Sequence, residues 1–100
     1  MLFRSNQIQS NPEYANKTTM IVLPDFGRDS DTDAGANGFQ HHRTGDAASR
    51  TTWMMALGPN VRQGLFVQRP IESIDLVPTV GKLLGFSTPL AQGSVLPEVA

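Results

Sequence analysis

The sequence predicts an α/β fold, on three observations. Two short runs, residues 18–23 and 51–57, have the apolar content and the length of buried strands. A polar connection over residues 26–50 separates them, which is too long for a hairpin turn and is typical of a functional loop. From residue 73 onward the apolar residues recur at helical spacing. Strands followed by a helix favour an α/β domain over an all-β one.

The N-terminal quarter of the chain leads into the first strand. Residues 1–10 hold sparse apolar positions and are expected to contain the end of a helix. Asn11-Pro12 is typical of a turn or of a helix start. The run 18–23 is apolar on both faces, as in a central strand of a covered sheet. Pro24 marks its end because proline cannot donate to a strand ladder.

The second strand and the helix complete the predicted core. Trp53 lies in the run 51–57, and we expect it to pack in the core. Ser73 is a plausible N-cap and Gly85 a plausible C-terminal stop, with Pro78 near the start of the helix. Residues 86–100 are expected to form a loop or a short edge element. The buried face of the helix is predicted to hold Ile74, Val77, Val80, Leu83 and Leu84.

Composition excludes several classes of function. The net charge of -1 and the isoelectric point near 6.0 provide no basic face for nucleic acid or for an anionic membrane. The longest apolar runs are too short to span a bilayer. Without cysteine the chain has no disulfide, no thiolate metal site and no cysteine nucleophile. The first residues lack the apolar stretch of a signal peptide, and the compartment stays undetermined.

The predicted elements do not make a closed domain. Two or three strands and one good helix leave one face of the sheet bare, so the chain should expose an apolar patch. We therefore expect residues 1–100 to be the C-terminal part of a single α/β domain whose N-terminal portion is its partner. A small independent domain that forms a homo-oligomer through the bare face is the alternative.

The candidate site begins where the first strand ends. Asp25 follows that strand, and His41 and His42 lie on the polar loop after it. Sites in α/β proteins form at the carboxyl ends of strands, and carboxylate and imidazole together bind zinc, iron or manganese. One Asp and one His are fewer than the three protein ligands usual for catalytic zinc, so further donors must come from elsewhere. Histidines that only form hydrogen bonds in a solvated loop are an equal alternative.

Two other motif matches fail. Residues 25–27 read Asp-Phe-Gly, but the glycine-rich loop, strand lysine and catalytic loop of a protein kinase are missing. Residues 29–40 begin like a calcium-binding loop. Ala34 then replaces the required glycine and Gln40 the required glutamate.

Four segments together resemble the alkaline phosphatase and sulfatase superfamily. Residues 19–28 resemble its strand followed by Asp-His-Gly, and residues 37–42 its later histidine motif. Residues 58–64 look like the Gly-Pro turn after a strand, and 74–85 like the Asp-x-x-Pro-Thr helix that ends these catalytic domains. Their order and approximate spacing agree with the family over residues 15–86.

The resemblance implies an alkaline-phosphatase-like α/β fold and a metal-dependent hydrolase of phosphate or sulfate esters. Asp25 would hold one divalent metal and either His41 or His42 the second, with zinc foremost and calcium or manganese as alternatives. The nucleophile and the remaining ligands would lie upstream, so this chain alone should not catalyse the reaction.

Two arginines and one phenylalanine qualify this interpretation. Arg28 or Arg43 would bind the anionic ester, although Arg28 is also placed to pair with Asp29. Phe26 stands where many members of the superfamily carry a metal-binding histidine. A non-catalytic binding or assembly module with a degenerate metal site is therefore the second hypothesis, and the chain's status as an enzyme remains open.

Overall fold

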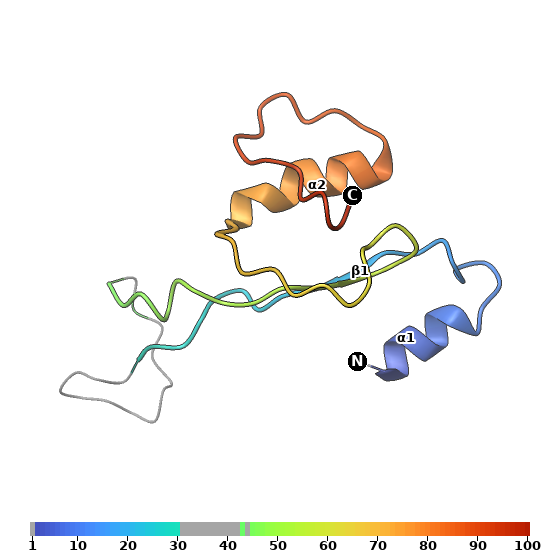
Figure 1. Ribbon diagram of the computed structural model, residues 1–100, viewed down its shortest axis with the longest axis horizontal. Helices are drawn as coiled ribbons and strands as arrows, with labels where there is room; N and C mark the ends of the chain where they lie inside the picture. Colours follow the sequence, from blue (N-terminus) through green and yellow to red (C-terminus); the bar gives the residue numbers. More distant parts are fainter. Residues whose placement is uncertain (1, 31–42, 44) are drawn as a thin grey trace. The chain divides into compact units, whose positions relative to one another are not determined.

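The structure is a computed structural model that describes residues 2–30, 43 and 45–100. In chain order it contains α1 (Leu2–Gln9), β1 (Met20–Val22), β2 (Met55–Leu57), the 3-10 turn η1 (Ser73–Asp75) and α2 (Leu76–Leu84) (Figure 1). The chain divides into two compact units, one formed by Met1–Met20 with Ala56–Ala100 and the other by Ile21–Met55. Helices and strands are both present, as the sequence predicts, in a loose mixed α/β arrangement.

The sheet is smaller than predicted. β1 and β2 pair with each other in an antiparallel sheet of two strands. Thr19 lies directly against Gly58, where an added Cβ would be 2.8 Å from the threonine Oγ1. Each strand spans three residues rather than the six or seven of the runs 18–23 and 51–57. Within the described residues neither strand is central or covered on both faces, in contrast to the sequence prediction.

Apolar side chains are widely exposed, as expected for an uncovered sheet and helix. Trp53 is 57% exposed, so the prediction that it packs in the core is wrong for this structure. Ile74, Val77 and Leu84 on the predicted buried face are also exposed. All four side chains are exposed for the same reason: the described residues provide no second layer of structure that packs against them.

The turn between α1 and β1 uses asparagine twice. The Oδ1 of Asn11 accepts the backbone N–H of Glu13 at 2.9 Å, which is an Asx turn rather than a helix cap. Asn16 adopts a left-handed conformation with φ of 58°, which asparagine tolerates better than most residues. Together they reverse the chain between α1 and β1, within the first unit.

Helix α2 starts and stops through backbone and side-chain bonds. The predicted N-cap Ser73 is instead the first residue of η1, whose N-cap is Glu72. A capping box forms there, in which the Oδ2 of Asp75 accepts the N–H of Glu72 at 3.0 Å. Gly85 adopts the left-handed conformation with φ of 78°, so the predicted C-terminal stop is confirmed. The N–H of Phe86 then donates to the carbonyl oxygen of Gly81 at 3.0 Å, as in a Schellman motif.

The C-terminal segment is bonded to the first turns of α2 (Figure 1). The hydroxyl of Thr79, whose exposed fraction is 0%, donates to the Asp75 carbonyl oxygen at 2.6 Å and accepts the Leu96 N–H at 2.9 Å. The Oδ1 of Asp75 accepts the Ser94 N–H at 2.8 Å. These bonds bring Leu96 and Val99 into the buried apolar core of this unit.

A second link lies near the end of the same segment. The guanidinium of Arg69 forms two hydrogen bonds with the Glu98 carboxylate, one of them at 2.9 Å from Nη2 to Oε2. This pairing lowers the pKa of Glu98 and raises that of Arg69. The Arg62 N–H donates to the Glu98 carbonyl oxygen at 2.9 Å. The C-terminal segment is therefore held to the rest of the unit at Ser94, Leu96 and Glu98.

The Thr79 hydroxyl should contribute measurably to stability. Thr79→Val keeps the shape of the side chain but leaves the buried Leu96 N–H without its acceptor, which should cost about 1–3 kcal/mol of unfolding free energy. Urea denaturation followed by circular dichroism measures the loss. Ser87→Ala, in an exposed loop of the same unit, is the matched control. Equal stability of the two variants would contradict this role.

Acid should loosen the C-terminal segment through Asp75. The N–H groups of Glu72 and then Ser94 lower the pKa of this carboxyl below its usual value of about 3.9. The stabilisation is therefore present above that value and is lost as the pH falls through the lower pKa of the folded state. Asp75→Asn should be less stable at neutral pH and should lose less stability between about pH 5 and pH 2. Glu13→Gln in an exposed turn is the control, and an unchanged pH profile in Asp75→Asn would refute the mechanism.

Candidate functional site

The second unit is an antiparallel ribbon, and one of its two arms carries Asp25 of the predicted site. The arms are the described residues after β1 and those before β2 (Figure 1). The N–H of Gly27 donates to the Ser49 carbonyl oxygen at 2.8 Å. A Cβ at Gly27 would lie 2.1 Å from the carbonyl oxygens of Ala48 and Thr51. Only glycine permits this approach of the two backbones.

Asp25 lies in the described chain just beyond the end of β1. Its side chain is exposed, and the neighbouring Phe26 is 47% exposed. An exposed carboxylate is a suitable oxygen ligand for a divalent cation. Because β2 runs antiparallel to β1, the carboxyl ends of these two strands do not meet at Asp25, in contrast to the usual α/β crevice.

His41 and His42 lie outside the described residues, so their approach to Asp25 stays a prediction. Among residues 2–30, 43 and 45–100, no three Asp, Glu or His side chains gather closely enough to hold a metal ion. A closed catalytic site needs about three protein ligands. Asp25 therefore fits a metal as one donor of a larger set, not as a site by itself.

Of the two predicted substrate-binding arginines, Arg43 has a defined partner in the ribbon. Its Nε donates to Oδ2 of Asp29 at 2.7 Å and its Nη2 to Oδ1 at 2.8 Å. Asp29 is 1% exposed, whereas the Arg43 side chain is 41% exposed. Arg28 is exposed on the other arm. The role of both arginines in binding an ester stays a prediction.

A second link joins the arms next to this ion pair. The Ser30 hydroxyl donates to Oδ2 of Asp46 at 2.5 Å, and Oδ1 of Asp46 accepts the Ala48 N–H at 2.8 Å. The Ser30 hydroxyl and then the Ala48 N–H lower the pKa of this carboxyl, against the charge of Asp29. Asp46 is thus a turn-forming residue of the ribbon.

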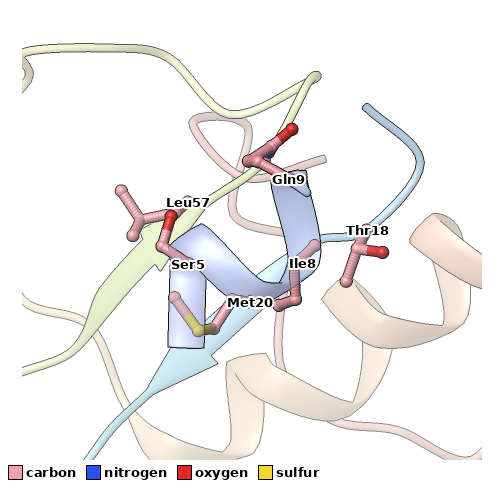
Figure 2. A pocket seen from close by; sticks show the side chains of 7 residues that line it. Ser5, Ile8, Gln9, Thr18, Met20 and Leu57 are labelled. Atoms are coloured by element: carbon pink, nitrogen blue, oxygen red, sulfur yellow. The ribbon is translucent and has the colours of Figure 1, made fainter. Parts of the chain in front are cut away.

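Two hollows of the first unit are lined by none of the residues of the predicted site. The hollow between α1 and the strands has a volume of about 30 Å³, and Ile8, Thr18 and Met20 are among the residues that line it (Figure 2). That volume admits a water molecule but no ester substrate. A larger hollow of about 330 Å³ lies by the last turn of α2 and carries two cations, Arg62 and Lys82. These two positive charges could attract an anion, but the side chains that line this hollow include no Asp, Glu or His that could bind a metal.

Sequence reasoning missed the two links between the arms. Asp29 and Arg43 are far apart in sequence, and no local pattern signals their pairing. Asp46 carried a weak signal, because an aspartate followed by small residues often forms a turn with the N–H two positions ahead. Asp75 and Thr79, by contrast, belong to a predicted motif, but their bonds to the C-terminal segment were not foreseen.

The chain was compared with protein families, with curated proteins and with solved structures, and it matches none of them. The resemblance to the alkaline phosphatase and sulfatase superfamily therefore depends on the motifs alone. Over the described part of the chain, no helix has the length and apolar character needed to cross a membrane.

The close approach at Gly27 should be sensitive to one methyl group. Gly27→Ala places a Cβ against two backbone carbonyls, and such overpacking should cost about 1–3 kcal/mol or more. The amide of residue 27 should then exchange with solvent at least about tenfold faster. Gly45→Ala is the matched control, because a Cβ there has no atom within 4 Å. Similar exchange in both variants would show that the arms do not pair here.

Proposed function

We propose that this chain forms part of the catalytic domain of a metal-dependent hydrolase of phosphate or sulfate esters. The arrangement of the ribbon is the observation that carries the proposal. Asp25 is exposed on one arm, and the other arm starts, in sequence, directly after His41 and His42. The Asp29–Arg43 pair joins these arms, and in sequence it involves the fourth residue after Asp25 and the first residue after His42. The four motifs of the superfamily in their usual order support the same reading.

Each candidate residue has a chemical task in this proposal. Asp25 supplies carboxylate oxygens, and His41 or His42 an imidazole, to a divalent cation, with zinc preferred over calcium or manganese. A bound cation of this kind stabilises the charge that develops on the ester oxygens. Arg28 is exposed on the same arm as Asp25 and suits an anionic ester oxygen. The nucleophile and the remaining ligands come from residues outside this chain.

The exposed apolar surface supports a partner that completes the domain. Several large apolar side chains of the first unit are more than half exposed, which is unusual for a self-contained domain. They are Phe3, Leu65, Phe66, Val77, Leu84, Phe86 and Leu90. The rest of the same catalytic domain is the proposed partner, and a second copy of this chain is the alternative.

A non-catalytic module with a degenerate metal site is the second candidate, because of Phe26. This phenylalanine stands where the superfamily often has a metal-binding histidine, and no imidazole is available at that position. Its 47% exposure indicates that core packing alone does not require an aromatic ring there. A fold kept for assembly would tolerate such a loss of one donor.

Zinc binding tests the two candidates. This chain should bind zinc only weakly, because the donor set is incomplete, and Asp25→Ala should weaken it further. Phe26→His should strengthen binding, since it adds a donor beside Asp25, and should leave the melting temperature nearly unchanged at a half-exposed position. Calorimetric and NMR titration with zinc, alongside thermal melting, measures both effects.

The opposite results are equally informative. A zinc affinity that is the same in Asp25→Ala as in the unchanged chain would refute the proposed metal site and favour the assembly module. Unchanged zinc affinity with a lower melting temperature in Phe26→His would show that Phe26 has a packing role. Sub-micromolar affinity in the unchanged chain would contradict the idea of an incomplete site.

A further inference from the structure

The Asp29–Arg43 ion pair has the features of a geometric constraint. Both carboxylate oxygens of Asp29 accept from one guanidinium, at 2.7 and 2.8 Å, in the side-on arrangement that fixes direction as well as distance. The side-chain exposure of Asp29 is 0%. A charge removed from water in this way is costly, and such a pair often adds little net stability compared with apolar residues. The pair therefore contributes less through net stability than through the fixed distance and direction that it imposes on the two side chains.

That geometry is the register of the two arms. Asp29 is on the arm after β1, and Arg43 is 14 residues along the chain on the other arm. The Ser30–Asp46 bond also joins these arms. Ser30 follows Asp29 on the first arm, whereas Asp46 lies three residues nearer to β2 than Arg43 on the other. The Gly27–Ser49 backbone bond lies on the β-strand side of both. Three contacts between the arms thus restrain the position of one arm along the other.

Asp25 lies on the arm that these contacts hold. It precedes Gly27 by two residues and Asp29 by four, so a shift of the arm would move its carboxylate. A change of register by one residue also turns every side chain of an extended arm to the opposite face. A metal ligand tolerates much less displacement than that.

We propose that Asp29 and Arg43 are positioning residues that set the metal affinity of Asp25 by fixing the register of the ribbon. This inference depends on the proposed metal site at Asp25. Arg43 then acts through Asp29 and does not contact the ester. Supporting groups around metal ligands typically change affinity by about 10–100-fold when they are removed.

Zinc titration of single and double variants of the whole chain tests this role. Arg43→Lys keeps the charge but cannot form the two-bonded fork, and Asp29→Asn keeps the shape. Each should weaken zinc binding about tenfold or more. Asp29→Asn/Arg43→Gln should lose no more than Asp29→Asn alone, because the two residues act as one unit. Arg50→Gln, which removes an exposed arginine from the same arm, should bind zinc like the unchanged chain.

Folding is measured separately, by amide exchange at Gly27 and by circular dichroism, so that affinity is compared among folded proteins. A purely stabilising pair would lower the melting temperature and leave zinc affinity within about twofold. That result, or losses that simply add in the double variant, overturns the inference. If Asp25→Ala abolishes binding while every Asp29 and Arg43 variant keeps it, only the inference fails. If the unchanged chain binds no zinc, the inference and the proposed function both fail.

Discussion

The first unit depends on the hydrogen bonds that Thr79 and Asp75 make with the C-terminal segment. Both side chains lie at the start of α2. The Asp75 carboxylate accepts the Ser94 N–H, and the Thr79 hydroxyl accepts the Leu96 N–H. A segment without regular secondary structure needs other hydrogen-bond partners for its backbone N–H groups, and these two side chains are the acceptors for two of them. Because Leu96 is thereby brought under α2, the small apolar core of this unit depends on two polar groups.

This arrangement also explains why α2 buries the side opposite to the one its sequence predicts. Residues 86–100 approach the buried side of α2 at Thr79, which accepts the Leu96 N–H, and at Gly81, where an added Cβ would meet Thr88 and the Phe86 carbonyl oxygen. The larger apolar residues Val77 and Leu84 stay exposed. The helix therefore has two faces that can be buried. One is used within the chain, and the other supports the proposal of a partner that completes the domain.

The ribbon follows a different principle. Its arms are joined by the charged pair Asp29–Arg43, by the Ser30–Asp46 bond and by a glycine contact, with little apolar burial. Polar contacts contribute modestly to the free energy of folding but require a defined geometry. If one partner moves, the other is left as a buried unpaired group, which lowers stability. Such a segment suits the presentation of ligands better than the building of a core. This division of roles between the units agrees with the proposed hydrolase domain, in which Asp25 belongs to the ribbon.

The sequence by itself determined the features that depend on short-range backbone energetics. The end of the first strand before Pro24, the left-handed stop at Gly85 and the helix between residues 73 and 85 all follow from local conformational preferences. Only the tertiary structure decided the antiparallel pairing of the strands, the exposure of Trp53 and the partners of Asp29 and Thr79. Those partners lie 14 and 17 residues away, and the path of the chain, which no local preference encodes, brings them within hydrogen-bonding distance.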